Sequence, residues 1–209
     1  MISSNLLNKL EKRKLSVTLD NILDNSKAKS GGDRDLNFLV YLVDRGLLVL
    51  SEAVLKRTDM DFPEEYYLER YKKINFETDR HFLCRTIIQE ELKKIGIITI
   101  SDLVAGNMDI LRSNSNYDIV TEDFSALVDI GLTPARNYFR GLTDLKVRNY
   151  FITTYFDDYI EEIIFGVFGR VNDQDYLDAV KDYEEGFKLF VPNKENQSED
   201  RNYYNTPRL

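Results

Sequence analysis

The segment TDLKVRNYFITTYFDDYIEEIIFGVFGRVNDQDYLDAVKDYEEGFKLF (143–190) carries the strongest hydrophobic pattern of this chain. Its first half places apolar side chains three, one, three, one and three residues apart, at Ile152, Tyr155, Phe156, Tyr159, Ile160 and Ile163. Its second half alternates spacings of four and three, at Tyr176, Val180, Tyr183, Phe187 and Phe190. Each spacing is typical of one face of a helix. With the glycine-containing stretch 166–169 between them, the two halves predict an antiparallel helical hairpin.

The residues before this segment also show helical spacing. Apolar side chains recur at three and four residues from Leu36 to Val54, which predicts one long buried helix over 35–55, with Gly46 as a costly interior residue or a break. Pro63 suits the first turn of a second helix. Thr78 and Asp79 are candidate caps of a third, which Gly96 ends.

Weaker patterns fill the remaining stretches. We expect a short helix within 5–25, a small β element near 97–120, and short helices over 122–130 and 134–140. The fold class expected is therefore mainly α, a helical bundle that ends in the helical hairpin.

The composition divides the chain into three parts. Residues 1–34 form a basic arm with a short helix and a flexible loop, 35–190 a helical domain, and 191–209 an extended interaction tail. The tail is too polar to build a core, yet it keeps a few groups suited to contact with a neighbour. Its candidate interaction residues are Tyr203, Tyr204, Pro207, Arg208 and Leu209.

Charge limits the classes of partner. The chain has a net charge of −8, which argues against nucleic acid as a partner except through the basic arm. Seven basic residues face four acidic ones in 1–34, whereas 154–200 holds thirteen acidic residues against four basic ones. Ends of opposite sign predict head-to-tail pairing between copies of the chain, although two solvated faces of different sign explain the same numbers.

Two further observations bear on the setting of the protein. The single cysteine, Cys84, excludes an internal disulfide framework. The longest apolar stretch, Leu36 to Leu55, is interrupted by charged residues, so we expect no membrane span and a soluble, cytoplasmic protein.

No motif specifies a reaction, a cofactor or a metal. His81 and Cys84 lie three residues apart on a predicted helix, but two ligands do not make a zinc site. On a helix, the pairs Asp157 with Glu161 and Asp158 with Glu162 have a spacing that suits Mg²⁺. The alternative to a Mg²⁺ site is a solvated acidic face. The acidic face 157–162 is the one place in the sequence for which we keep a metal-dependent or regulatory role as a hypothesis.

Part of the chain resembles a known family. The Lys-Lys-Ile-Gly turn (93–96), the predicted aromatic helix, the Phe-Gly pairs (165–166 and 168–169), the acidic helix (173–190) and the tail resemble head–tail adaptor, or connector ring, proteins of short-tailed bacteriophages. The resemblance implies a small acidic helical bundle that forms a ring and lays its tail on neighbouring subunits. It also implies a place in the virion and a portal or tail component as a partner.

These observations together predict a non-enzymatic structural subunit of a symmetric assembly whose partners are copies of itself. The alternative is a regulatory binding protein or a metal-dependent enzyme that uses the acidic face 157–162.

Overall fold

The structure, a computed structural model, describes most of the chain except its ends and five internal stretches. The described residues are 6–15, 33–58, 60–73, 77–100, 117–153 and 160–190.

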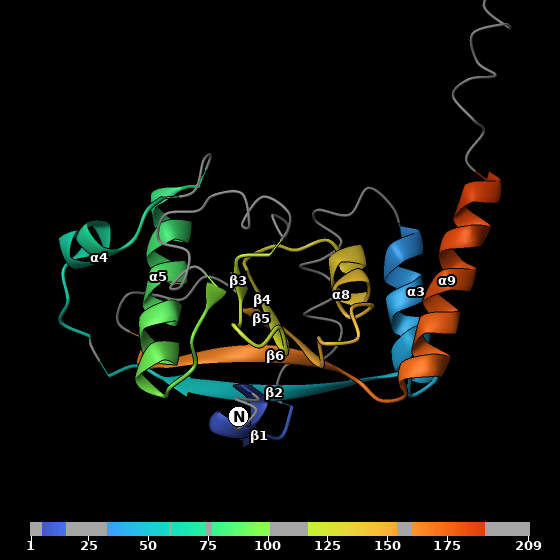
Figure 1. Cartoon of the computed structure of the whole chain (residues 1–209), viewed down its shortest axis with the longest axis horizontal. Helices are drawn as coiled ribbons and strands as arrows, with labels where there is room; N and C mark the ends of the chain where they lie inside the picture. Colours follow the sequence, from blue (N-terminus) through green and yellow to red (C-terminus); the bar gives the residue numbers. More distant parts are fainter. Residues whose placement is uncertain are drawn as a thin grey trace, which may run out of the picture.

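One mixed β-sheet of six strands organises the fold, in the order β1-β2-β6-β5-β4-β3 (Figure 1). Strands β4 and β5 are parallel and are joined through helix α8, whereas the other neighbouring pairs are antiparallel. The strands are β1 (Glu11–Arg13), β2 (Leu48–Lys56), β3 (Ile119–Val120), β4 (Ala126–Ile130), β5 (Asn149–Thr153) and β6 (Glu162–Arg170).

The helices gather toward the two ends of this sheet. Figure 1 shows α4 and α5 toward one end, and α8 with the adjacent α3 and α9 toward the other. The helices are α1 (Leu6–Lys9), α3 (Asp33–Asp44), α4 (Glu64–Arg70), α5 (Asp79–Lys94), α8 (Ala135–Gly141) and α9 (Asp173–Phe190).

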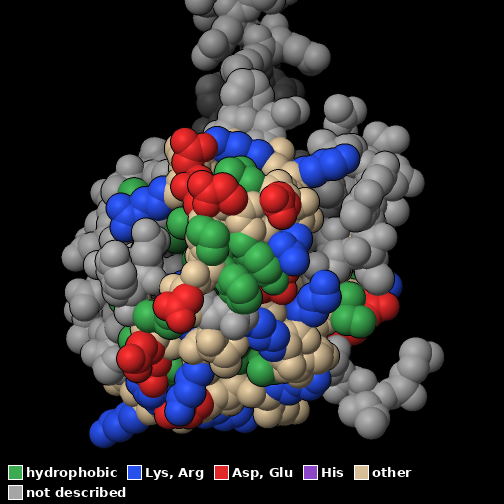
Figure 2. Space-filling view, turned by 90° about the vertical axis from the view of Figure 1, so that its left-hand side faces the viewer, with side chains coloured by type: hydrophobic (Ala, Val, Ile, Leu, Met, Phe, Trp, Pro, Cys, Tyr) green, Lys and Arg blue, Asp and Glu red, His purple; other side chains and the backbone are tan. Residues whose placement is uncertain are grey.

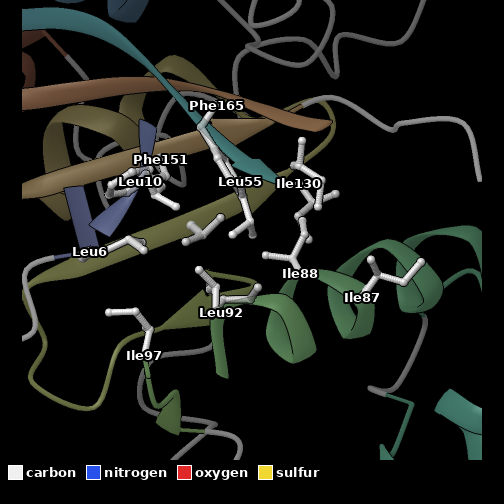
Figure 3. Packing of buried hydrophobic residues seen from close by; sticks show 14 of the residues in the cluster. Leu6, Leu10, Leu55, Ile87, Ile88, Leu92, Ile97, Ile130, Phe151 and Phe165 are labelled. Carbon is white, nitrogen blue, oxygen red and sulfur yellow. The ribbon is translucent and has the colours of Figure 1, made fainter. Parts of the chain in front are cut away.

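Buried side chains form one hydrophobic cluster on each face of the sheet. Successive residues of a strand point to opposite faces, so Phe151 joins the cluster under α5 while Tyr150 and Ile152 join the cluster under α3, α8 and α9. Figure 3 shows the first cluster, in which Ile88 and Leu92 of α5 lie against strand residues such as Ile130. Because helices cover both faces, the central strands are apolar at nearly every position.

The mainly α fold class and the helical bundle are therefore wrong: the protein is an α/β fold with a six-stranded mixed sheet. The helical hairpin over 143–190 exists only in its second half, as α9. Of the described residues around its first half, 149–153 form β5 and 162–170 form β6, which pair antiparallel, whereas 154–159 lie outside the described residues. The Phe-Gly pairs at 165–166 and 168–169 lie within β6, and not in a loop between helices.

The predicted helix over 35–55 is also two elements. Helix α3 ends at Asp44, and Gly46 adopts a φ of +68°, a conformation that side chains with a Cβ disfavour. The amides of Gly46 and Leu47 donate to the carbonyl oxygens of Val43 and Leu42, which is a helix stop of the Schellman type. The chain then turns into β2.

Other local predictions met different outcomes. The helix expected over 122–130 is wrong, because 126–130 is β4. The helices expected after Pro63, after Thr78 and over 134–140 are confirmed as α4, α5 and α8. The β element near 97–120 is confirmed in small form, as β3 and a single bridge between Thr99 and Thr121. Residues 101–116 of that region lie outside the described residues.

Candidate functional site

A chain of ionisable side chains crosses the β3 edge of the sheet and is the most chemically distinctive feature of the described structure. It begins with two carboxylates on neighbouring strands. Asp118 directly precedes β3 and Asp129 lies in β4, and the register that pairs Ile119 with Val128 sets the two aspartates opposite each other. The amide of Asp118 donates to Oδ1 of Asp129 at 3.3 Å, and the amide of Ile130 donates to Oδ2 of Asp118 at 2.7 Å.

His81, in the first turn of α5, reaches this pair from the α5 face of the sheet. The Thr78 hydroxyl caps α5 by accepting a hydrogen bond from the backbone amide of His81. The His81 ring is held at both nitrogens: Nε2 lies 3.2 Å from Oδ2 of Asp118, and Nδ1 lies 2.7 Å from Oε1 of Glu77.

A buried arginine supports the other side of His81. Nε of Arg85 lies 2.8 Å from Oε1 of Glu77, and its terminal nitrogens reach Oε2 of Glu77, the side chain of Gln89 and the carbonyl of Lys72. Glu77 therefore balances two cations, Arg85 and the protonated His81, which lets three ionic side chains lie partly or wholly out of water.

At the other end of this series of ionisable side chains, Asp129 and Tyr150 are buried in the core under α8. The Tyr150 hydroxyl donates to Oδ2 of Asp129 at 2.5 Å, and both side chains are nearly fully buried. The ring of Tyr138 packs edge-on against Tyr150, and its hydroxyl donates to the carbonyl of Thr133. Water has little access to Asp129 from this side.

This environment moves the proton affinities of both central groups. Burial, and then the charge of Asp118, raises the pKa of Asp129 to about 7, although the hydrogen bond from Tyr150 opposes the shift. Burial by itself would lower the pKa of His81, but its hydrogen bonds and charge interactions with Asp118 and Glu77 raise that pKa to about 9. At neutral pH the imidazole is therefore protonated, and Asp129 lies close to its midpoint.

These positions restrict the chemistry that the site can perform. His81 has no free ring nitrogen with which to take a proton from a substrate, because Glu77 and Asp118 occupy both. Asp129 and Tyr150 are too deeply buried to touch a substrate. Oδ1 of Asp118 is the exception: no hydrogen bond to it is found within the described residues, and the side chain of Asp118 is 25% exposed.

The structure describes only some of the residues proposed from sequence as chemistry-bearing. His81 turns toward Asp118, whereas Cys84 is buried in the α5 cluster. In residues 6–15, 33–58, 60–73, 77–100, 117–153 and 160–190, no group of three or more His, Cys, Asp or Glu side chains is arranged to hold a metal ion.

The acidic face 157–162 is not a helix face where it is described. Glu162 lies in β6 and forms a bidentate ion pair with Arg13, at 2.8 Å and 2.7 Å, so it does not lie on the helix on which a pair with Asp158 was expected. Asp157 and Asp158 lie outside the described residues, as do the tail residues Tyr203, Tyr204, Pro207, Arg208 and Leu209.

Sequence reasoning missed Asp118, Asp129 and Tyr150. One signal was present: Asp129 interrupts the otherwise apolar run Ala126–Ile130, and an aspartate inside a buried strand needs hydrogen-bonding partners. The helix expected over 122–130 hides this signal, because a helix near the surface can turn an aspartate toward water.

A second feature lies at the α4 end of the molecule. Phe62 and Tyr66 are stacked with ring centroids 4.0 Å apart, and the guanidinium of Arg70 lies 3.7 Å from the centroid of Tyr66. Phe62 and Leu68 are 41% and 51% exposed. Figure 2 turns this end toward the viewer and shows a group of hydrophobic side chains bordered by acidic and basic ones. An exposed apolar group with a polar rim is typical of a surface that contacts another molecule.

Comparison with protein-family models, with curated proteins and with solved structures gives no match. Among the helices that the structure describes, none has both the length and the apolar character needed to cross a bilayer.

Proposed function

We propose that the protein is a non-enzymatic structural subunit that assembles with copies of itself. The observation that supports this most directly is the α4 end, where Phe62 and Leu68 expose apolar surface beside carboxylates that form no ion pair with any described residue. Burial of that surface against a neighbour releases ordered water, at about 25 cal/mol per Å² of apolar area.

The ionisable side chains at the β3 edge of the sheet also support this proposal, because they favour a structural role over a catalytic one. Both nitrogens of His81 and the buried carboxyl of Asp129 are committed to partners within the chain. Such a network fixes α5 against β3 and β4, which is a structural task, and within the described residues Oδ1 of Asp118 is the one carboxylate oxygen of Asp118 and Asp129 exposed without a hydrogen bond. The fixed scaffold would then present α4 in one orientation.

A pair of matched variants tests the proposal. Leu68→Asp places a charge on the α4 surface, whereas Leu145→Asp places the same charge on a leucine that is 57% exposed elsewhere. In sedimentation velocity of the full chain, we expect Leu68→Asp to weaken self-association and Leu145→Asp to leave it unchanged. Equal behaviour of the two variants would remove the support that α4 gives to the proposal.

The tail 191–209 remains a separate sequence-based proposal for the same role. The adaptor resemblance stays a sequence-based proposal. Part of its pattern takes another form in the structure, because residues 149–153 form β5 and the Phe-Gly pairs lie in β6. The function proposed here does not depend on a ring or on a place in a virion.

A metal-dependent hydrolase is the second candidate, favoured by the open Oδ1 of Asp118 beside Asp129. Mg²⁺ is commonly held by only one or two carboxylates, with water and substrate phosphate as its other ligands, so a cluster of three protein ligands is not required. Mg²⁺ or Mn²⁺ should then raise the melting temperature of the wild-type chain and not that of Asp118→Asn. If each ion changes the melting temperature of the two proteins by the same amount, or changes neither, this candidate is excluded.

A further inference from the structure

We infer that the copies assemble head to tail, through contact between an acidic surface on α4 and a basic surface on β1. The inference rests on the self-assembly proposed above and names the two surfaces that would carry it.

The first surface, called here the acidic α4 surface, combines carboxylates with exposed apolar groups. It consists of Asp61, Phe62, Glu64, Glu65, Leu68 and Glu69. The four carboxylates are exposed, and within the described residues none of them forms an ion pair. The nearby cations are partly committed, since Arg70 is stacked on Tyr66 and Lys73 pairs with Asp79. The surface therefore carries an excess of negative charge.

The second surface, called here the basic β1 surface, consists of Lys12, Lys14 and Val49. Both lysines are exposed, and neither has an ion-pair partner among the residues described. Lys12 pairs in register with Ala53 of β2. Val49, which is 53% exposed, lies on the same side of β2 as Ala53 because the two are an even number of residues apart. Arg13, the intervening basic residue, is occupied by Glu162.

The positions of the two surfaces set the kind of assembly. Figure 1 shows α4 at one end of the molecule and β1 beside β2, and β1 is an edge strand of the sheet, so the two surfaces are separate regions of one copy. Contact between different surfaces is heterologous, and it repeats from copy to copy until a ring closes or a filament forms. Opposite charge favours this pairing over contact between two acidic α4 surfaces or two basic β1 surfaces.

The size of the two surfaces determines how tightly the copies are expected to associate. They hold few apolar side chains, and stable interfaces bury roughly 1,200 Å² or more in total, so these two alone predict weak association. Exposed charges are screened by salt, so the association should weaken as ionic strength rises.

Reciprocal charge reversal in the full-length chain tests the pairing. One variant carries Glu64→Lys with Glu65→Lys, and the other carries Lys12→Glu with Lys14→Glu. The first variant cancels the negative charge of the acidic α4 surface, and the second gives both surfaces a negative charge, so we expect the apparent Kd for self-association of each to rise about tenfold or more. In a mixture of the two, the introduced lysines of one variant meet the introduced glutamates of the other, so association should return in the mixture.

A third variant serves as the matched control. Asp175→Lys with Asp182→Lys makes the same change of charge on exposed residues of α9 and should associate as the wild type does. Circular dichroism of each variant checks that the fold is kept.

The outcomes separate this inference from the proposed function. A wild-type chain that stays monomeric would refute the self-assembly itself. A wild type that associates, with reversal variants that associate equally well, would refute these surfaces and leave self-assembly standing. If both variants lose association and the mixture does not recover it, head-to-tail pairing of these two surfaces is refuted. If only the Glu64 and Glu65 variant loses association, head-to-tail pairing is refuted in favour of contact between two α4 surfaces.

Discussion

The hydroxyl of Tyr150 on β5 lies 2.5 Å from Oδ2 of Asp129 on the parallel strand β4, with both side chains almost completely removed from solvent. A buried carboxyl group is costly unless donors surround it, and Tyr150 supplies the shortest of the hydrogen bonds that Asp129 accepts. The pair links the core under α8 to the ionic side chains at the β3 edge.

Removal of this hydroxyl should destabilise the fold. Tyr150→Phe leaves a buried carboxyl oxygen without its donor, and we expect the free energy of unfolding to fall by about 1–3 kcal/mol. Urea denaturation gives the value. Tyr41→Phe is the control, because Tyr41 is 44% exposed and the loss of its hydroxyl should change stability by less than about 0.5 kcal/mol. Equal effects in the two variants would contradict the role given to Tyr150.

The stability of the fold should fall as pH rises from about 5 to about 9. The pKa of Asp129 is raised to about 7 and that of His81 to about 9, so both groups bind protons more tightly when folded. The Asp129 contribution is complete below its ordinary pKa of 3.8 and is lost as pH rises through about 7. The His81 contribution is complete below its ordinary value of 6.5 and is lost through about 9.

Two variants separate these contributions. Asp129→Asn should flatten the lower part of the pH profile of the free energy of unfolding, and His81→Gln should flatten the upper part. A wild-type chain that grows more stable from pH 5 to pH 9 would contradict both assignments.

The closeness of α8 to the sheet gives a steric prediction. A Cβ on Gly141 would lie 2.8 Å from the ring of Tyr150 and 2.9 Å from Leu127, so Gly141→Ala should cost about 1–3 kcal/mol. Gly186 in α9 is the matched control, since its nearest neighbour would be Arg34 at 3.9 Å. There the change to alanine should stabilise the helix by about 0.5–1 kcal/mol. Thermal and urea unfolding of both variants test the contrast, and a stabilising Gly141→Ala would show that α8 can move away.

The cap of α5 supports the position of His81. The Thr78 hydroxyl accepts from the amide of His81 at 3.2 Å, and Thr78→Ala should lower the free energy of unfolding by about 1 kcal/mol. Thr78→Ser keeps the acceptor and should recover most of the loss. If the serine variant is no more stable than the alanine variant, the capping hydrogen bond contributes nothing measurable.

The sequence predicted helices well where one side faces water and the ends carry stop signals. Helix α9 exposes acidic residues opposite Tyr176 and Val180, and α5 lies between the Thr78 cap and Gly96. It failed where strands are covered on both faces. All five residues of β5 are buried, so the period of two that marks a strand is absent, and Ile152 matched a helical spacing by chance.

The candidate site was less predictable than the fold. Asp118 and Asp129 become neighbours only through the pairing of β3 with β4, and His81 reaches them from α5, 37 residues before Asp118 in the sequence. Strand pairing depends on the whole sheet. A predicted helical bundle has no β3 and β4 to pair, so it cannot bring Asp118 and Asp129 together.

The most direct test of the account is the solution mass of the full chain, measured by light scattering across a wide range of concentrations. Self-assembly predicts a mass that rises above the 24.5 kDa of one copy as concentration increases, and that falls back when salt is added. A mass of one copy at every concentration and at low salt would contradict the central claim that this protein assembles with itself.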